Sequence, residues 1–351
     1  MKKLIDRYKS LRTRRQLRLE TSGEFAFVGI GSHARQNLYP VLQHLGVPLR
    51  YICCRGGGKP HGRKLSLIEA RYGVQATTDL GQVLDDPQVR GVLVCTGPDS
   101  HFDIARRVLE SGKSLFVEKP PCRTLRQLSE LVSIADARPV RSCDCLVGMQ
   151  KRYAPAVKIL RHRLDRCRPV SYRMTYAMGA FPEGDPLLEL FIHPLDLLCH
   201  LFGEPEVVGV STLQRNRGEL TLQLLLRHGA ISGLAELSTR HSWTGAFEHL
   251  SVNSTQGAFE LHNLERLTFS PHPRTLLRIP LEKLRPSIPA LHTLYACNGV
   301  LPTVPNNQLV TAGFCDELRT FVALADGRSS TNLSPLTSLL PTYRLLDALR
   351  I

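Results

Sequence analysis

The chain has 351 residues, of which 42% are hydrophobic and 22% are charged. This length and balance are typical of a globular protein with about two domains, and they exclude a chain that is disordered throughout. Neither a secretory signal nor an apolar run long enough to cross a membrane is present in the sequence. Ten cysteines occur without the spacing of a zinc site or a disulfide framework. We therefore expect reduced thiols, no bound metal and a cytoplasmic location.

The formal net charge of +14 makes an anionic partner worth considering. Residues 1–20 carry eight lysines and arginines, and Leu4, Tyr8 and Leu11 fall on one helical face. We expect residues 1–23 to form a basic helical segment that packs on its own domain. Weak contact of residues 1–20 with a membrane surface stays open as an alternative. Nucleic-acid binding is not expected, because no DNA- or RNA-binding signature accompanies the charge.

Residues 24–150 alternate short apolar runs with helical patterns, which is typical of a parallel sheet wrapped by helices. The apolar runs predict strands at residues 25–30, 49–54, 91–96, 114–118 and 140–149. The helical patterns lie between them, at residues 33–45, 104–111 and 124–137. This alternation predicts a doubly wound Rossmann domain over residues 24–150.

Beyond residue 150 the pattern changes to extended segments joined by short polar turns, which indicates an antiparallel sheet. The predicted strands are residues 170–178, 207–214, 220–227, 230–239, 249–253 and 258–261. Helices are predicted at residues 187–202 and 314–325, and the proline-rich residues 270–305 are expected to be irregular. We therefore predict an α+β second domain over residues 151–351 with a mostly antiparallel open sheet.

A glycine-rich turn follows the first predicted strand and opens a helix, where a dinucleotide fingerprint has to lie. It reads Gly29-Ile30-Gly31-Ser32-His33-Ala34. Gly29 permits the tight turn, Gly31 lets the backbone approach a pyrophosphate, and Ala34 allows the helix to pack closely on the strand. The backbone N–H groups at such a helix start attract a negative charge. The turn therefore predicts a nicotinamide dinucleotide site.

The end of the second predicted strand bears on which nicotinamide cofactor binds. An acidic residue there would bond the ribose 2′-hydroxyl, whereas an arginine accommodates a 2′-phosphate. Arg55 occupies the place, no acidic residue follows before Glu69, and Lys59 and Lys64 add positive charge. We therefore expect NADP(H), with NAD(H) as the alternative.

Four motifs in a fixed order connect the chain to a known family, with a fifth, looser match. They are the Gly29–Ala34 turn, Thr96-Gly97-Pro98-Asp99-Ser100-His101, Glu118-Lys119-Pro120, His193-Pro194-Leu195-Asp196 and, more loosely, Gly148-Met149-Gln150-Lys151-Arg152-Tyr153-Ala154-Pro155. In this order the chain resembles the Gfo/Idh/MocA oxidoreductases, the glucose-fructose oxidoreductase and inositol dehydrogenase types. The resemblance covers about residues 24–325 and implies a Rossmann domain followed by a substrate domain.

The resemblance implies roles for particular residues. Lys119 would donate a hydrogen bond to the reacting oxygen, and His193 would serve as the acid and base. Glu189 stands where similar enzymes carry an aspartate four residues before the histidine. Cofactor contacts are implied for Gly29, Gly31, Ser32, His33, Ala34, Arg55, Thr96, Gly97, Pro98, His101, Glu118 and Lys119, and substrate contacts for Arg152, Tyr153 and Asp196. Pro194 implies that the helix either kinks or begins near His193.

The activity implied by the resemblance is hydride transfer between nicotinamide C4 and a carbinol or carbonyl carbon. The substrate would be a sugar, a sugar acid or a cyclitol. Two alternatives stay open: a glycosidase of the same fold that oxidises its substrate transiently with bound NAD, and a regulatory protein that binds NADP without catalysis. An exposed face on the second sheet would support a homodimer or homotetramer, as in similar proteins.

Overall fold

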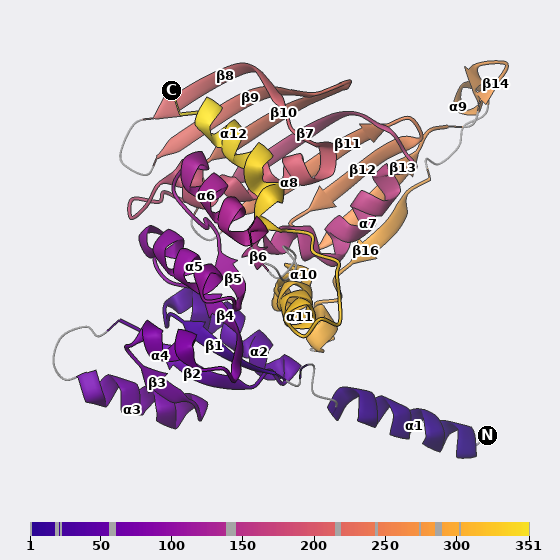
Figure 1. Cartoon of the computed structure of the whole chain (residues 1–351). Helices are drawn as coiled ribbons and strands as arrows, with labels where there is room; N and C mark the ends of the chain where they lie inside the picture. Colours follow the sequence, from indigo (N-terminus) through magenta and orange to yellow (C-terminus); the bar gives the residue numbers. More distant parts are fainter. Residues whose placement is uncertain are drawn as a thin grey trace.

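Two β-sheets organise the chain, and both appear in Figure 1 with their helices. The computed structural model describes residues 2–17, 21, 23–55, 61–137, 145–214, 219–242, 245–273, 275–284, 290–301 and 303–350. Within these residues the first sheet has six strands and the second has eight. None of the described helices combines the length and the apolar character that a membrane span requires.

The first sheet is parallel throughout and has the strand order β3-β2-β1-β4-β5-β6. Its strands are β1 (Glu24–Val28), β2 (Leu49–Cys53), β3 (Gln75–Thr77), β4 (Val89–Val94), β5 (Ser114–Glu118) and β6 (Cys145–Gly148). The central strands are apolar on both faces because helices cover both. The order reverses between β1 and β4, so the carboxyl ends of these strands flank the place where such sheets bind dinucleotides.

The helices of this sheet are α2 (Tyr39–Leu45), α3 (His61–Tyr72), α4 (Leu80–Asp85), α5 (His101–Glu110) and α6 (Leu125–Asp136). A single π-type turn, η1 (Ala34–Leu38), leads from the glycine turn into α2. The predicted Rossmann domain is confirmed. Its predicted last strand corresponds to β6, and the predicted residues 140–144 lie outside the described residues.

Helix α11 (Phe314–Ala325) also packs on the first sheet, although it comes from the far end of the chain (Figure 1). Its Phe321 ring contacts Phe25 and Phe116 at centroid distances of 5.9 and 5.7 Å. The division at residue 150 did not anticipate this packing. One turn earlier, Glu317 is fully buried, and burial raises the pKa of its carboxyl well above the ordinary value, as does the charge of Glu118.

The second sheet has the strand order β16-β13-β12-β11-β7-β10-β9-β8. Its strands are β7 (Pro169–Ala177), β8 (Glu206–Gln214), β9 (Leu220–His228), β10 (Ile231–Ser238), β11 (Phe247–Ser254), β12 (Gly257–His262), β13 (Arg266–Pro271) and β16 (His292–Ala296). All neighbours are antiparallel except β7 and β10. The predicted α+β class is confirmed. Strand β16 corrects the prediction for residues 270–305, since pairing with β13 makes part of this segment regular.

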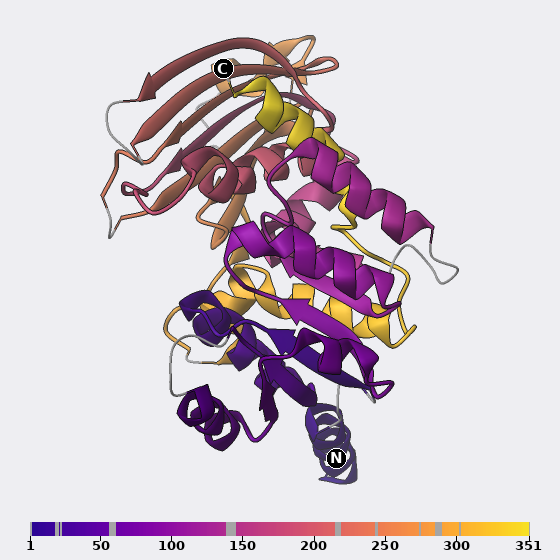
Figure 2. The same ribbon diagram turned by 60° about the vertical axis from the view of Figure 1, so that its left-hand side comes forward.

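Only one face of the second sheet carries helices, as Figures 1 and 2 show. These are α7 (Pro155–Leu164), α8 (Ile192–Phe202) and α12 (Leu340–Ala348), of which only α8 corresponds to a predicted helix. Buried and more exposed residues alternate along β9, β10 and β12, because the opposite face is open in the described part of the chain. The homo-oligomer contact expected on such a face stays a prediction.

The segment predicted as one helix over residues 187–202 is divided in two. A π-type turn, η5 (Pro186–Leu190), comes first, and α8 begins at Ile192. Pro194 is the third residue of α8. The N–H groups of a first turn form no intrahelical hydrogen bond, so a proline there costs the helix none. Of the two expected outcomes at this proline, the structure therefore has a helix that begins there.

Helix α1 (Lys2–Leu17) projects away from both sheets in Figure 1. Its apolar side chains are exposed, with exposed fractions of 71% for Leu4 and 62% for Tyr8. The expected helix is present, but its described side chains do not pack on the Rossmann domain. Contact with a membrane surface stays a prediction.

A buried ion pair fastens α8 to the end of the first sheet. Arg152, in the 3-10 helix η4 (Gln150–Tyr153) after β6, donates from Nε to Asp196 Oδ2 at 2.8 Å and from Nη2 to Asp196 Oδ1 at 2.5 Å. Both residues are 2% exposed. The guanidinium also donates to the carbonyl of Leu333, and Thr342 donates to Asp196. These bonds satisfy both buried charges, which is what makes such a pair tolerable in a core.

We expect Asp196→Ala to lower the free energy of unfolding by about 3–5 kcal/mol, because it leaves the Arg152 guanidinium buried and uncompensated. The matched control is Glu204→Ala, which removes an equally well aligned partner from the exposed Arg344 and should cost under about 1 kcal/mol. Urea unfolding of both variants measures the difference. Equal, small losses would show that the pair is not structural.

Candidate active site

The glycine turn has the geometry that a dinucleotide requires. Gly29 has a φ of +119°, and a Cβ atom there would lie 1.9 Å from the carbonyl oxygen of Cys95, so only glycine fits. The Tyr39 hydroxyl donates to the Gly29 carbonyl at 3.0 Å and holds the turn from behind. A Cβ at Gly31 would meet no atom within 4 Å, so the space in front of this residue is open to a pyrophosphate. Ala34 is fully buried against the strand, as predicted.

The end of β2 lies beside this turn, because the N–H of Gly29 donates to the carbonyl of Cys53 at 2.9 Å. Arg55 follows two residues later and is exposed. Lys64 in α3 donates from Nζ to the Arg55 carbonyl at 3.3 Å, so it stays near the same loop. Lys59 lies outside the described residues. The structure thus places the Lys64 ammonium group beside the backbone of Arg55.

The loop after β4 is tied to the loop after β5 by His101, which is 1% exposed. Its Nδ1 is 2.8 Å from the carbonyl oxygen of Pro120, and its Nε2 is 3.0 Å from the carbonyl oxygen of Thr96. Burial lowers the pKa of His101, so the ring stays neutral. It therefore holds the two loops together, while Thr96, Gly97 and Pro98 remain at least partly accessible.

Glu118 closes β5 with a buried carboxylate. His33 Nε2 lies 3.2 Å from Glu118 Oε1, and Asn37 Nδ2 lies 2.8 Å from His33 Nδ1, so hydrogen bonds hold the ring on both sides. Burial alone would raise the pKa of Glu118, but the bond from His33 and the charges of His33 and Lys119 outweigh it and hold this pKa below its ordinary value. The glycine-turn helix is therefore linked to the strand that presents Lys119.

Lys119 points from the end of β5 toward the second lobe. Its Nζ donates to the backbone carbonyl of Glu189 at 2.8 Å, and its peptide bond to Pro120 is cis. Burial lowers the pKa of Lys119, an effect that Glu118 and Glu189 oppose. The ammonium group is thus held by a carbonyl, which leaves its other N–H donors for a further acceptor.

The resemblance implied that the Glu189 side chain would support Lys119 or His193, but no described hydrogen bond joins its carboxylate to either of them. The carboxylate binds Nη1 of Arg123 at 2.9 Å instead, and Arg123 also pairs with Asp99. The reason is local: the turn η5 ends at Leu190, so Glu189 and His193 do not share one regular helix. The contribution of Glu189 to Lys119 comes from its backbone carbonyl.

His193 lies in the first turn of α8, and its ring is the strongest candidate for an acid or base in this site. Its Nδ1 atom is buried and has no hydrogen-bond partner among the residues that the structure describes. Burial lowers the pKa of His193 well below 6.5, and the positive charges of Lys119, Lys151 and His33 lower it further. The ring is therefore neutral at pH 7, and none of the described residues bonds to its buried nitrogen.

Lys151 is a site residue that the sequence analysis missed. Its Nζ pairs with Glu248 Oε2 at 2.5 Å and lies 4.7 Å from the centre of the Tyr176 ring. Its charge acts on both Lys119 and His193. The sequence analysis recognised the motif that contains Lys151, but it predicted the next two residues, Arg152 and Tyr153, as the substrate contacts.

The prediction that Arg152, Tyr153 and Asp196 contact substrate needs correction. All three are 2% exposed. Arg152 and Asp196 satisfy each other, and the Tyr153 hydroxyl shares a hydrogen bond with Ser334 at 3.0 Å. In the short 3-10 helix after β6, Lys151 pairs with Glu248, whereas Arg152 and Tyr153 are held in the core.

The residues present fit a nicotinamide dinucleotide. The open turn at Gly31 would receive the pyrophosphate, and the link from His33 through Glu118 to Lys119 leads from that turn toward His193. The structure thus brings together Gly29, Gly31, Ala34, Glu118, Lys119 and His193. Arg152, Tyr153 and Asp196 are instead buried, with Arg152 bonded to Asp196 and Tyr153 to Ser334.

The comparisons with known proteins agree with this reading of the fold. Residues 24–144 match a family model described as "Oxidoreductase family, NAD-binding Rossmann fold". An uncharacterised oxidoreductase, YhhX of Escherichia coli, is 29% identical over 55% of this chain and 59% of its own length. The scyllo-inositol 2-dehydrogenase (NAD(+)) of Bacillus subtilis is 28% identical over 44% of this chain and 47% of its own. The chain therefore spans about half the length of these relatives.

A dehydrogenase from Chromobacterium violaceum has the same overall fold, with a TM-score of 0.73 and 21% identity. This similarity covers 93% of both chains, so it includes the second sheet as well as the first. The chain is thus similar to the Gfo/Idh/MocA oxidoreductases over its NAD-binding Rossmann domain, and it shares its fold with a dehydrogenase over nearly its whole length.

Proposed function

We propose that the protein is an NADP(H)-dependent oxidoreductase that transfers hydride between nicotinamide and a carbinol or carbonyl carbon of a sugar, sugar acid or cyclitol. The observation that carries this proposal is the buried, unpartnered Nδ1 of His193 beside the positive charges of Lys119 and Lys151. A buried polar nitrogen without a partner is costly unless a ligand supplies one. A substrate hydroxyl is the group that fits it.

When bound, the nicotinamide would supply the hydride acceptor or donor. In oxidation, neutral His193 accepts the hydroxyl proton at Nδ1, and the Lys119 ammonium donates a hydrogen bond to the same oxygen as negative charge develops there. Lys151 adds a second positive charge to this environment. In reduction, the imidazolium of His193 returns the proton. The Glu189 carbonyl keeps Nζ of Lys119 in place throughout.

The preference for NADP(H) rests on the loop after β2. Exposed Arg55 and nearby Lys64 offer a positive pair to a 2′-phosphate, and the strand end lacks the carboxylate that would bind a free ribose hydroxyl. The B. subtilis relative carries NAD(+) in its name, so the preference has to be measured on this chain.

The direct test is a screen of sugars, sugar acids and cyclitols with NADP+, NADPH, NAD+ and NADH. The absorbance of the reduced cofactor measures turnover in each mixture. Turnover of at least one polyol or its ketone supports the proposal. Cleavage of an aryl glycoside without net change in the cofactor would identify the glycosidase alternative instead. Tight cofactor binding without any turnover would identify the regulatory alternative.

We expect Lys119→Ala to reduce kcat/KM by about 10²–10⁴-fold while NADPH affinity changes little, because the lost ammonium acts on the reacting oxygen. The matched control is Lys158→Ala, which removes an exposed lysine of α7 and should leave kcat/KM unchanged. Steady-state kinetics and NADPH fluorescence titration separate the two effects. Full activity in Lys119→Ala would remove the mechanism.

The pH profile of oxidation follows from the lowered pKa of His193. Because burial and nearby lysines favour the neutral ring, the base form persists below pH 6.5, and kcat/KM for oxidation should fall only at more acidic pH. Reduction, which needs the protonated ring, should rise over the same acidic range. In His193→Gln, the change of kcat/KM at acidic pH, here called the acidic limb, should disappear from both profiles. A limb that persists in the variant would assign the titration to another group.

Arg55→Ala should weaken NADPH binding by about 10- to 100-fold, the loss expected when charge-assisted hydrogen bonds of about 1.5–3 kcal/mol are removed. NADH binding should change little, since NADH has no 2′-phosphate. Arg106→Ala, at an exposed arginine of α5, is the control. Fluorescence titrations with both cofactors provide the comparison, and equal losses for NADPH and NADH would contradict the assignment.

A further inference from the structure

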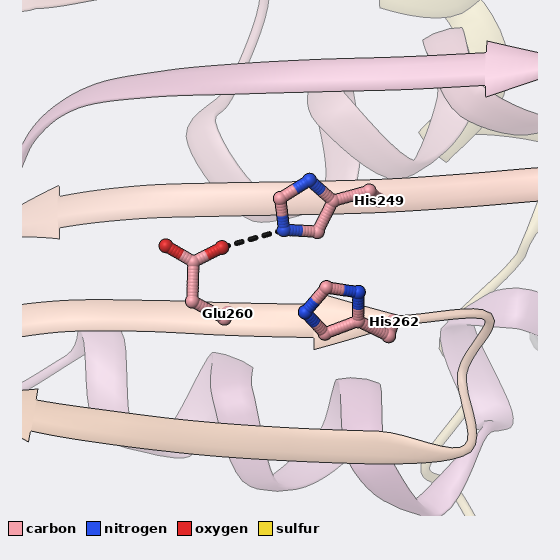
Figure 3. Close-up of side chains that lie close together, drawn as sticks. All are labelled: His249, Glu260 and His262. Atoms are coloured by element: carbon pink, nitrogen blue, oxygen red, sulfur yellow. Dashed lines mark hydrogen bonds and ion pairs between the residues drawn. The ribbon is translucent and has the colours of Figure 1, made fainter. Parts of the chain in front are cut away.

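A cluster of two histidines and a glutamate lies on the open face of the second sheet (Figure 3). His249 belongs to β11, and Glu260 and His262 belong to β12. In the antiparallel register His249 faces His262 directly, and Glu260 lies two residues before His262 on the same side. One strand thus presents two potential ligands at i and i+2, and its neighbour presents the third.

This cluster is separate from the candidate active site. Successive side chains of a strand point to opposite faces. Glu248 points to the helix-covered face, where it binds Lys151, whereas His249 points to the open face. The sheet itself therefore lies between the cluster and His193, and the inference does not rest on the proposed function.

The three side chains have the arrangement of metal ligands. Their ligand atoms all lie within 4.8 Å of one another. His249 Nε2 is 2.5 Å from Glu260 Oε2, and the two imidazole rings are stacked with centroids 4.3 Å apart. A tetrahedral zinc ion with bonds of about 2.0–2.2 Å holds its ligand atoms about 3.3–3.6 Å apart. Small rotations of these side chains would bring them to that spacing without moving the strands.

The surroundings of the cluster also favour a metal ion. Ser251 donates to Glu260 Oε1 at 2.8 Å and orients the carboxylate, in the way that outer partners orient metal ligands. The carboxylate charge of Glu260 opposes the repulsion that Arg266 would exert on a cation.

We propose that His249, Glu260 and His262 bind one divalent transition-metal ion, with Zn²⁺ as the representative ion. Three protein ligands leave a coordination position open. A hollow of about 570 Å³ borders His249 and Glu260 and gives water or a further ligand access to that position. The site is of mixed nitrogen and oxygen character, which suits zinc, cobalt or nickel better than calcium or magnesium.

The test uses the full chain after removal of metals by a chelator. Equilibrium dialysis against Zn²⁺ should give one ion per chain that His262→Ala and Glu260→Gln lose or bind more than about tenfold more weakly, since even the loss of an outer partner costs about 10–100-fold. The matched control is His292→Ala, an exposed histidine on β16 of the same sheet, which should retain the ion. Equal stoichiometry and affinity in all these proteins would overturn the proposal.

Two further measurements address the cysteines and the folding of the variants. Co²⁺ in this site should give visible d–d bands without strong near-ultraviolet charge-transfer absorption, whereas such absorption would assign the metal to thiolates and overturn the proposal. Ser251→Ala keeps all three ligands and should still weaken Zn²⁺ binding by about 10–100-fold. Metal-free Tm values and NADPH affinities equal to those of the parent chain show that the substituted proteins are folded, independently of any turnover.

Discussion

The buried pair between Arg152 and Asp196 determines how the two halves of the candidate active site meet. Arg152 follows the last strand of the Rossmann sheet, and Asp196 lies one turn after His193 in α8. Because both charges are almost fully buried, neither can leave the other without a large loss of electrostatic compensation. The position of α8, and with it that of His193 relative to Lys119, is therefore set by an interaction that touches no substrate.

The charges of two lysines act on a buried nitrogen that has no hydrogen-bond partner among the described residues. Lys119 comes from the end of β5 and Lys151 from the short helix after β6, and His193 contributes the nitrogen from α8. The Glu189 carbonyl and the Glu248 carboxylate hold the two lysines from the second lobe. Positive charge and a neutral imidazole in one place form an environment in which an alkoxide is stabilised and a proton can be moved.

The second sheet separates two kinds of chemistry by the alternation of its side chains. Glu248 and His249 are neighbours in sequence, yet one belongs to the candidate active site and the other to the proposed metal site. Helices cover the first face only (Figures 1 and 2), so the other remains available to water, metal ions or another chain. A rigid sheet of this kind can carry a second site without disturbing the first.

Local patterns in the sequence were enough for the features that depend on local backbone. Residue type and spacing predict the glycine turn, the Rossmann alternation and Lys119 at a strand end, because each is decided by sterics or hydrogen bonding within a few residues. At Pro194 they left a kinked helix and a helix start as alternatives, and the structure has the start. Contacts between distant segments had no such signal. Only tertiary packing decided that Lys151 rather than Arg152 acts on His193, that Glu189 pairs with Arg123, and that α11 packs on the first sheet. Strand register alone placed His249 opposite His262. These depend on which side chains can be buried together, and that is a property of the assembled chain.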